Sequence, residues 1–297
     1  MTAPFRPVLN KESPVAGIVA PASPVDRENL ERALPVLEKK GWRLKLGENL
    51  FARDRFCAGT DEQRAHDLHA FFADGSVDLI VAARGGYGTT RMLPLLDYGF
   101  IAEHPKPFVG LSDTTALQNA LLRKSNIVTF SGFVLSIDVR EGGISPVTES
   151  SLDDALAGIP QTFRGTTLYA GEAKGTLTGG CLSLMECLTG TPYLPDMRGS
   201  ILLLEDVGED PYRIDRMMSH LFSAGVFDGL AGIAFGEFYR CSPKDKNDGS
   251  VNDVLNEWGN KLKIPAVGNI IYGHQPNHCV VPVGGQAVIE NGALCVF

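Results

Sequence analysis

Paired cysteines and clustered metal ligands are missing from this sequence of 297 residues. No two cysteines form a C-x-x-C pair, which argues against a disulfide framework and favours reduced, buried thiols. The sequence also lacks groups of ligands at the short spacing that a zinc site requires. We therefore expect a protein without metal or cofactor, whose dispersed cysteines are Cys57, Cys181, Cys187, Cys241, Cys279 and Cys295.

Excess positive charge and long apolar runs are also lacking. The formal net charge is −8 and no patch of Lys and Arg stands out, so a nucleic-acid partner is not expected. No run approaches the ~18 apolar residues of a membrane helix. Residues 1–25 are rich in proline and lack the apolar centre of a secretory signal. These absences predict a cytoplasmic globular protein that binds neither membrane nor nucleic acid.

What the sequence does contain is an alternation of strand and helix signals within a composition that is 44% hydrophobic. Short apolar runs at Gly17–Ala20, Val77–Ala83 and Ile127–Phe130 predict buried strands. Between them, Asp26 is a candidate helix cap and Thr60–Gln63 a candidate capping box. Alternation of this kind is typical of a doubly wound, mostly parallel sheet with helices on both faces.

A glycine-rich stretch from residue 158 to 180 separates this region from a more mixed second half. We interpret it as a linker or a crossing point between domains, which gives an N-terminal domain over 1–165 and a C-terminal domain over 166–297. In the second half, Ile201–Leu204 predicts a buried strand, Asp210 is expected to cap a helix that starts at Pro211, and Asn291-Gly292 predicts a hairpin turn.

Three residues of chemical interest are each expected at the end of a strand. Ser112, in KPFVGLSDTTAL, lies where a strand meets a helix, and is either a helix cap or a nucleophile. Glu205 follows the apolar run 201–204 and is either a solvated loop acid or a functional carboxylate. His274 follows GNIIYG, interpreted as a strand, and His278 in the same loop is its rival. Nucleophile, base and orienting acid need these three residue types, which only the fold can unite.

The segment RGGYG, residues 84 to 88, also follows a predicted strand but matches no phosphate-binding motif. A tight turn is its ordinary explanation. Alternatively, a glycine N–H in this segment completes an oxyanion hole with the N–H that follows Ser112.

Four segments together resemble the LD-carboxypeptidase family, serine peptidases that include muramoyltetrapeptide carboxypeptidases and microcin C immunity hydrolases. The segments are VGLSDTTAL, RGGYG, GTPYLPDMRGSILLLEDVGEDPYRIDRMMSHL and GHQPNHCVVPVG. The resemblance runs from about Val15 to the C-terminus. It implies a doubly wound, flavodoxin-like N-terminal domain, a smaller C-terminal α/β domain with a β-rich core, a site between them, and a homodimer. One departure is Cys181, where the family usually has asparagine.

The resemblance also implies an activity, the release of a terminal D-amino acid (D-Ala) from the L,D amide of a murein tetrapeptide. The expected roles are Ser112 as nucleophile, His274 as general base, Glu205 as its orienting acid, Gly86 and Asp113 as oxyanion N–H donors, and Arg84 and Thr114 as substrate-binding residues. A carboxypeptidase must also bind a free carboxylate, for which Arg84, Arg91 or another nearby cation is a candidate. Two alternatives remain open. One is hydrolysis of a peptidyl nucleotide or acyl-sulfamoyl adenylate, and the other is a non-catalytic module that binds a small ligand.

Overall fold

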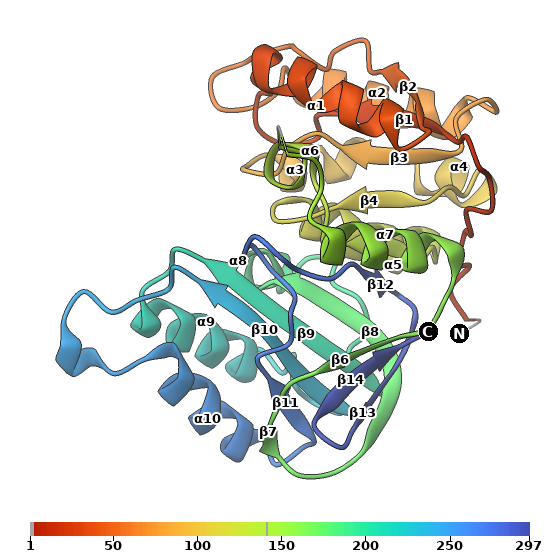
Figure 1. Cartoon of the computed structure of the whole chain (residues 1–297). Helices are drawn as coiled ribbons and strands as arrows, with labels where there is room; N and C mark the ends of the chain where they lie inside the picture. Colours follow the sequence, from red (N-terminus) through yellow and green to blue (C-terminus); the bar gives the residue numbers. More distant parts are fainter. Residues whose placement is uncertain (1–2, 141) are drawn as a thin grey trace.

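The computed structural model describes residues 3–140 and 142–297, which form two lobes, each built on one β-sheet (Figure 1). In the first sheet every strand pair is parallel except β12 with β5. Its strands, in spatial order, are β12 (Val281–Val283), β5 (Thr129–Ser131), β4 (Phe108–Gly110), β3 (Leu79–Ala82), β1 (Val15–Val19) and β2 (Arg43–Leu46). The order 2-1-3-4-5 of its parallel strands is the flavodoxin-like order, which confirms the predicted fold class.

Helices cover both faces of this first sheet. Along β1, Val15 and Val19 pack into one hydrophobic core with α2 and α5, whereas Ala16 and Ile18 pack into a second core with α1, α6 and α7. Both faces are therefore buried, as a parallel sheet requires. The helices of this lobe are α1 (Arg27–Lys39), α2 (Asp61–Ala73), α3 (Thr89–Met92), the 3-10 turn η1 (Leu93–Leu95), α4 (Tyr98–Glu103), α5 (Thr114–Ser125), α6 (Leu135–Asp138) and α7 (Pro146–Ala157).

The second lobe is built on an eight-stranded mixed sheet. Strands β8 to β11 run parallel at its centre, and the remaining pairs are antiparallel. In spatial order the strands are β6 (Gln161–Arg164), β14 (Ala293–Val296), β13 (Gln286–Glu290), β8 (Ala173–Cys181), β9 (Ser200–Val207), β10 (Gly232–Tyr239), β11 (Ala266–Gly268) and β7 (Thr166–Tyr169). Its helical segments are α8 (Leu182–Leu188), α9 (Pro211–Ser223), η2 (Lys246–Asp248) and α10 (Val251–Leu262). No helix in the described ranges has the length and apolar character of a membrane span.

The helix starts were predictable from their caps in two cases. Asp26 accepts a hydrogen bond from the Asn29 amide at 2.8 Å, and Thr60 and Gln63 form the reciprocal capping box that opens α2. For α9 the predicted start at Pro211 is confirmed, and Asp210 occupies the N-cap position. Its side chain, however, makes no capping hydrogen bond. Its carboxylate is engaged by a lysine from the loop after β10.

Residues 158–180 are not a linker, because most of this stretch forms β6, β7 and β8 of the second sheet, but the chain does cross here from the first lobe to the second, which is the alternative interpretation. Its glycines allow strands to approach each other closely. A Cβ on Gly175 would lie 2.1 Å from the Gly199 carbonyl oxygen, and one on Gly179 would lie 2.1 Å from that of Leu203. The glycine content therefore reflects tight packing in a sheet.

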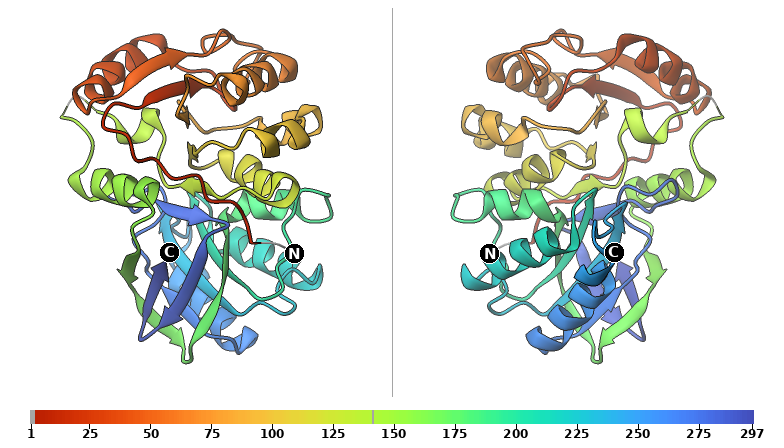
Figure 2. Two further views of the ribbon diagram at one scale, coloured as in Figure 1. Left: turned by 90° about the vertical axis from the view of Figure 1, so that its right-hand side faces the viewer. Right: turned by 90° about the vertical axis from the view of Figure 1, so that its left-hand side faces the viewer.

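The two lobes exchange strands across the boundary that the sequence suggested. Strand β6 precedes residue 165 but pairs with β14 in the second sheet, and β12 lies near the C-terminus but pairs with β5 in the first. Figure 2 shows β12, in blue, at the junction between the lobes. The division into domains 1–165 and 166–297 stays a prediction, but the chain crosses between the sheets more than once.

Candidate active site

Ser112 lies on a tight turn between β4 and α5. Its φ of 68° is in the left-handed region, an unusual conformation for a residue with a side chain. The N-cap of α5 is Asp113, without a capping side-chain bond, and the Ser112 carbonyl accepts from the Thr115 amide at 2.9 Å. Ser112 is therefore not the helix cap, and its strained backbone needs another explanation. Strain of this kind is concentrated at functional sites.

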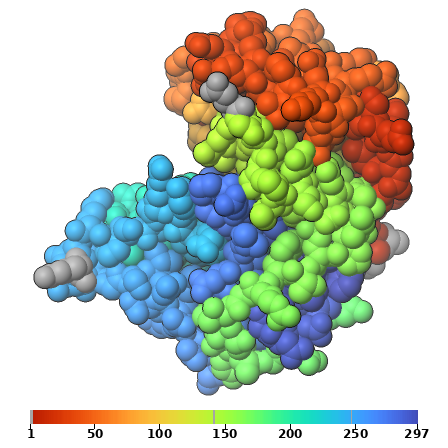
Figure 3. Space-filling model, viewed as in Figure 1, coloured from red at the N-terminus to blue at the C-terminus, as the bar shows by residue number. Residues whose placement is uncertain are grey.

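The Ser112 side chain faces a cleft of about 720 Å³. The cleft opens beyond the carboxyl ends of β1 and β3, the point where the strand order of a doubly wound sheet reverses and where ligands collect in such folds. Its walls come from the start of α1, the loop after β3 and helix α6. All residues that line this cleft belong to the first lobe, and neither Glu205 nor His274 is among them. The space-filling view also shows the surface hollowed where the two lobes meet (Figure 3).

The first three residues of the RGGYG loop, Arg84 to Gly86, line this cleft next to Ser112. A Cβ on Gly85 would lie 2.7 Å from the Cβ and 3.1 Å from the Oγ of Ser112, so only glycine leaves the hydroxyl room. Gly86 has a φ of 107°, and a Cβ there would collide with Ser23. Ser23 also fixes the loop, because its Oγ accepts from the Tyr87 amide at 3.0 Å. Backbone therefore lines the space in front of the serine.

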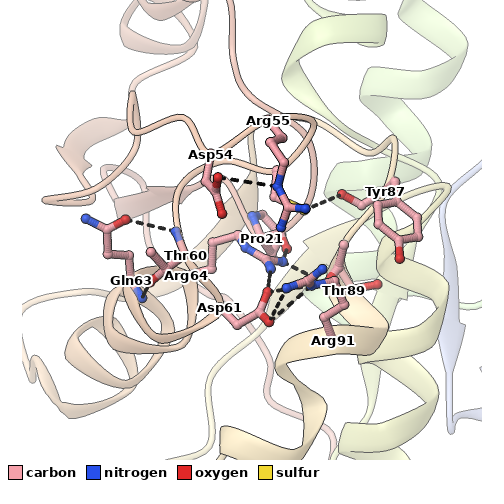
Figure 4. A network of polar contacts seen from close by, with 12 residues as sticks. Pro21, Asp54, Arg55, Thr60, Asp61, Gln63, Arg64, Tyr87, Thr89 and Arg91 are labelled. Atoms are coloured by element: carbon pink, nitrogen blue, oxygen red, sulfur yellow. Dashed lines mark hydrogen bonds and ion pairs between the residues drawn. The ribbon is translucent and has the colours of Figure 1, made fainter.

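A buried arginine, Arg64, holds this loop in place, and nothing in the sequence singled it out. The Arg64 guanidinium donates to the Pro21 carbonyl at 2.8 Å and to the Gly88 carbonyl at 2.7 Å, so it ties the loop after β1 to the loop after β3 (Figure 4). Asp61 accepts from both Arg64 and Arg91. An arginine following a capping box gives no sign in sequence that it will be buried.

The remaining residues predicted around the serine have different surroundings. Asp113 is buried, and its carboxylate accepts from the Thr89 amide at 2.8 Å. Thr114 is also buried, with its hydroxyl bonded to the Leu111 carbonyl at 3.0 Å, so it has no surface to offer a substrate. Arg84 is exposed and lines the cleft. Arg91, the alternative cation, does not line it and is paired with Asp61.

Glu205 is fully buried two residues before the end of β9, so the alternative of a solvated loop acid is wrong. Burial raises the pKa of this carboxyl, and the neighbouring His274 offsets part of that rise. Its Oε2 accepts a hydrogen bond from the His274 ring, while Oε1 has no hydrogen-bond partner among the described residues. A carboxylate held this way costs free energy, which a functional partner would explain.

His274 contacts Glu205 through its Nδ1, 2.6 Å from Oε2. Because a carboxylate oxygen accepts, Nδ1 carries the hydrogen and the neutral ring presents the lone pair of Nε2. That nitrogen has no hydrogen-bond partner in the described part of the chain. Burial by itself would lower the pKa of His274, but the charge and hydrogen bond of Glu205 outweigh it, and the pKa is raised above 6.5.

The strand predicted just before His274 is wrong. Strand β11 ends at Gly268, and the GNIIYG residues after it form a loop. Left-handed or otherwise positive φ values at Asn269 (57°) and Gly273 (135°) prevent an extended strand. The segment is apolar because Ile270 and Tyr272 are buried in the core. A Cβ on Gly273 would approach Glu205 Oε2 to 2.9 Å, so glycine here allows the loop to reach the carboxylate.

Direct contacts between the lobes bring the serine turn and this pair to the same junction. Thr115, in the first turn of α5, accepts from the Cys181 amide at 3.1 Å through its hydroxyl. Cys181 in turn lies opposite Glu205 in the β8–β9 register. On the other side, the hydroxyls of Ser131 and Tyr272 lie 2.8 Å apart. The first turn of α5, which directly follows the Ser112 turn, therefore packs on the end of β8, beside the residue that carries the carboxylate.

His278, the rival histidine, has a structural environment. Its Nε2 forms a fully buried ion pair with Asp138 Oδ1 at 3.0 Å, and its Nδ1 lies 2.5 Å from the Gln275 carbonyl oxygen. Asp138 also accepts from the Val134 amide at 2.7 Å. The pair fastens the loop that carries His274 to α6, one wall of the cleft. Nδ1 of His278 is thus hydrogen-bonded and Nε2 faces the Asp138 carboxylate at ion-pair distance, without a hydrogen bond of good geometry among the described residues.

A serine on a strained turn and a histidine held by a buried carboxylate are the parts from which serine hydrolases are built. Two family descriptions match the chain: LD-carboxypeptidase N-terminal domain over residues 16–132 and LD-carboxypeptidase C-terminal domain over residues 174–289. The chain therefore belongs to the LD-carboxypeptidase family, as its motifs had suggested.

Three relatives illustrate the range of this similarity. A probable murein peptide carboxypeptidase of Bacillus subtilis is 36% identical over 96% of this chain and 92% of its own length. The crystal structure of muramoyltetrapeptide carboxypeptidase from Oxalobacter formigenes is 30% identical, covers 95% of this chain and 97% of the other, and has a TM-score of 0.87. The microcin C7 self-immunity protein MccF of Escherichia coli is 25% identical over 91% of this chain and 88% of its own.

Proposed function

We propose that this chain is a serine-type LD-carboxypeptidase that releases the C-terminal D-amino acid, D-Ala, from a murein tetrapeptide. The observation that carries the proposal is the buried contact between His274 and Glu205, in which the Nε2 of His274 has no hydrogen-bond partner among the described residues. The first turn of α5, which follows Ser112, packs at the same junction. The names of the more similar relatives, which refer to murein peptides and muramoyltetrapeptide, favour this substrate over the microcin type.

In the proposed mechanism the Ser112 hydroxyl attacks the carbonyl carbon of the scissile amide while His274 Nε2 takes its proton. The N–H groups of Asp113 and Gly86 stabilise the oxyanion, a contact worth about 10²- to 10³-fold in rate per donor. Collapse breaks the C–N bond, and the imidazolium returns the proton to the leaving amine. Water then repeats the sequence on the acyl-enzyme. Glu205 holds the ring orientation and stabilises its charge, and Arg84 is the candidate for the free carboxylate.

Ser112→Ala tests the proposal. We expect it to reduce kcat by about 10³-fold or more on an L,D tetrapeptide, measured as released D-Ala by mass spectrometry. Ser150→Ala, an exposed serine on α7, is the matched control and should keep full activity. A Ser112→Ala enzyme with undiminished turnover would refute the nucleophile.

One further substrate and one covalent probe distinguish the alternatives. Turnover of an acyl-sulfamoyl adenylate without turnover of the tetrapeptide would favour the microcin type of hydrolase. A serine-directed fluorophosphonate that labels the native protein but not Ser112→Ala would support an enzyme. Absence of turnover on every substrate, together with absence of labelling, would favour a binding module.

We also propose that the protein is a cytoplasmic homodimer. All six cysteines are free thiols, which is typical of a reducing compartment. The dimer is the assembly that the family resemblance implies. Light scattering coupled to gel filtration should give twice the 32.0 kDa of one chain, and a mass of one chain at micromolar concentration would contradict the dimer.

A further inference from the structure

A second hollow of about 450 Å³ adjoins the Ser112 cleft, and of its lining residues the proposed mechanism uses only Arg84. We call it the arginine pocket, because four of its lining residues are Arg27, Arg53, Arg55 and Arg84. It shares Arg84 and the residues just before α1 with the cleft, but Ser112 lines only the cleft. A group bound in this pocket would therefore belong to the same ligand, some distance from the reacting carbonyl.

The charge in this pocket is unbalanced. Its one acidic residue, Asp26, is already engaged with the Asn29 amide as the cap of α1. Arg27 pairs with Glu31 at 3.4 Å and Arg55 with Asp54 at 3.6 Å, but neither of these acids lines the pocket. Arg53 forms no ion pair among the described residues, and the hydrogen bond of Arg84 goes to the neutral Pro24 carbonyl at 2.8 Å. The cleft adds Arg32 and Arg140 to its lining. Such a concentration of positive charge, in a chain whose net charge is −8, creates a local field that attracts anions.

The pocket also has the shape and position of a ligand site. It lies beyond the carboxyl ends of β1, β2 and β3, beside the point where the strand order reverses. Arg27 is held in place by stacking over Phe51 at 3.7 Å. Phe56 lines the pocket and meets the exposed Tyr87 ring edge to face at 5.3 Å. Figure 4 shows Arg55 between Asp54 and Tyr87.

We propose that the arginine pocket binds an anionic group, a phosphate or a carboxylate, carried by the part of the substrate that is not released. Guanidinium groups recognise both anions through paired, charge-assisted hydrogen bonds. The exposed rings give a surface on which a sugar or another ring next to the anion can pack. That the anion belongs to the substrate rests on the proposed function, whereas anion binding in the pocket does not.

The test uses Arg53→Gln with Arg55→Gln in one protein, because neither residue lines the Ser112 cleft. The control is Arg216→Gln on α9, an exposed arginine of the second lobe. The first measurement is calorimetric titration with inorganic pyrophosphate. We expect the wild type and the control to bind it and the double variant to lose at least tenfold in affinity, the effect of removing hydrogen bonds between charged groups.

The second measurement compares kcat/KM on three tetrapeptides: one with a neutral N-terminal cap, one with a phosphorylated sugar at that end, and one with an additional carboxylate there. We expect about tenfold preference for one anionic peptide, expressed in KM and lost in the double variant, while turnover of the neutral peptide is unchanged. Preference for the phosphorylated peptide identifies phosphate as the anion, and preference for the other identifies carboxylate.

Equal KM values for all three peptides in wild type and variant, with no pyrophosphate binding, would overturn the inference. Failure of the proposed function is distinguishable, because the wild type would then release no D-Ala from any peptide. In that case the pyrophosphate titration alone decides whether the pocket binds anions.

Discussion

At the scale of single residues, Gly85 leaves no room for a side chain beside Ser112. A methyl group there would fall on the Cβ and Oγ of Ser112. We expect Gly85→Ala to lower kcat/KM by about 100-fold or more, because the serine must move from its attacking position. The control is Gly75→Ala, where a Cβ meets nothing within 4 Å and activity should be unchanged. Full activity of Gly85→Ala, with the fold verified by circular dichroism, would show that the serine does not react from this position.

The contact of His274 with Glu205 makes a prediction about pH. A general base acts in its neutral form, and the pKa of His274 is raised, so the acidic limb of the kcat/KM profile should lie above pH 6.5. Glu205→Gln removes the charge that raises this pKa. We expect the limb to move to lower pH and kcat to fall by about 10²- to 10⁴-fold. A limb that stays in place in Glu205→Gln would mean that another group titrates.

The sequence indicated the right residue types here but not their surroundings. From sequence, Ser112 is either a helix cap or a nucleophile, because a single serine does not reveal its backbone conformation. The structure excludes the cap, since Asp113 is the N-cap of α5 and Ser112 has a φ of 68°. The burial of Glu205 depends on the loop after β11 and on β10, because Gly273 and Gly236 both lie directly against its side chain and are distant in the chain. The close approach of the Gly85 backbone to Ser112 could not be predicted either, because two adjacent glycines allow such an approach but do not require it.

At the scale of elements, the loop that carries His274 depends on the buried pair between His278 and Asp138. Burial lowers the pKa of His278, but Asp138 more than compensates, and the pKa is raised above 6.5. The pair therefore contributes its full stability below about pH 6.5 and loses it as pH rises through the folded-state pKa. Asp138→Asn should cost about 3 kcal/mol at pH 6 and less at pH 9.

Thermal unfolding of both proteins at pH 6 and pH 9 measures this difference. The wild type should lose more stability than Asp138→Asn between the two values. Gln161, in β6, helps to anchor the same region through Ser151 and is not titratable, so Gln161→Leu should lower stability equally at both pH values. A pH dependence that is the same in wild type and Asp138→Asn would contradict the role of the pair.

Element types were predicted best where caps and periodicity agree, as in α1 and α2. They were predicted worst where tertiary packing decides. The stretch 158–180 has the glycine content of a linker, but its glycines serve strand contacts with partners more than 20 residues away, such as Gly175 with Gly199. The apolar GNIIYG segment has the composition of a strand, but positive φ values at both ends of it make a loop.

At the scale of the whole molecule, the exchange of β6 and β12 predicts that the two halves depend on each other. A fragment of residues 1–165 lacks β12 and the His278 partner of Asp138, and it carries β6 without its sheet. We expect neither 1–165 nor 166–297 to unfold cooperatively alone, as followed by circular dichroism on heating. Co-expression of both fragments should restore a cooperative transition. A sharp transition of isolated 1–165 would instead support two independent domains.

The late position of β12 in the chain also has a consequence for biosynthesis. Strand β5 acquires its antiparallel neighbour only when residues 281–283 leave the ribosome, after every other strand of the first sheet has been made. Until then the nascent first sheet carries an unprotected apolar edge, open to pairing with other chains. A premature stop codon ahead of β12 would therefore harm the earliest part of the protein to be translated.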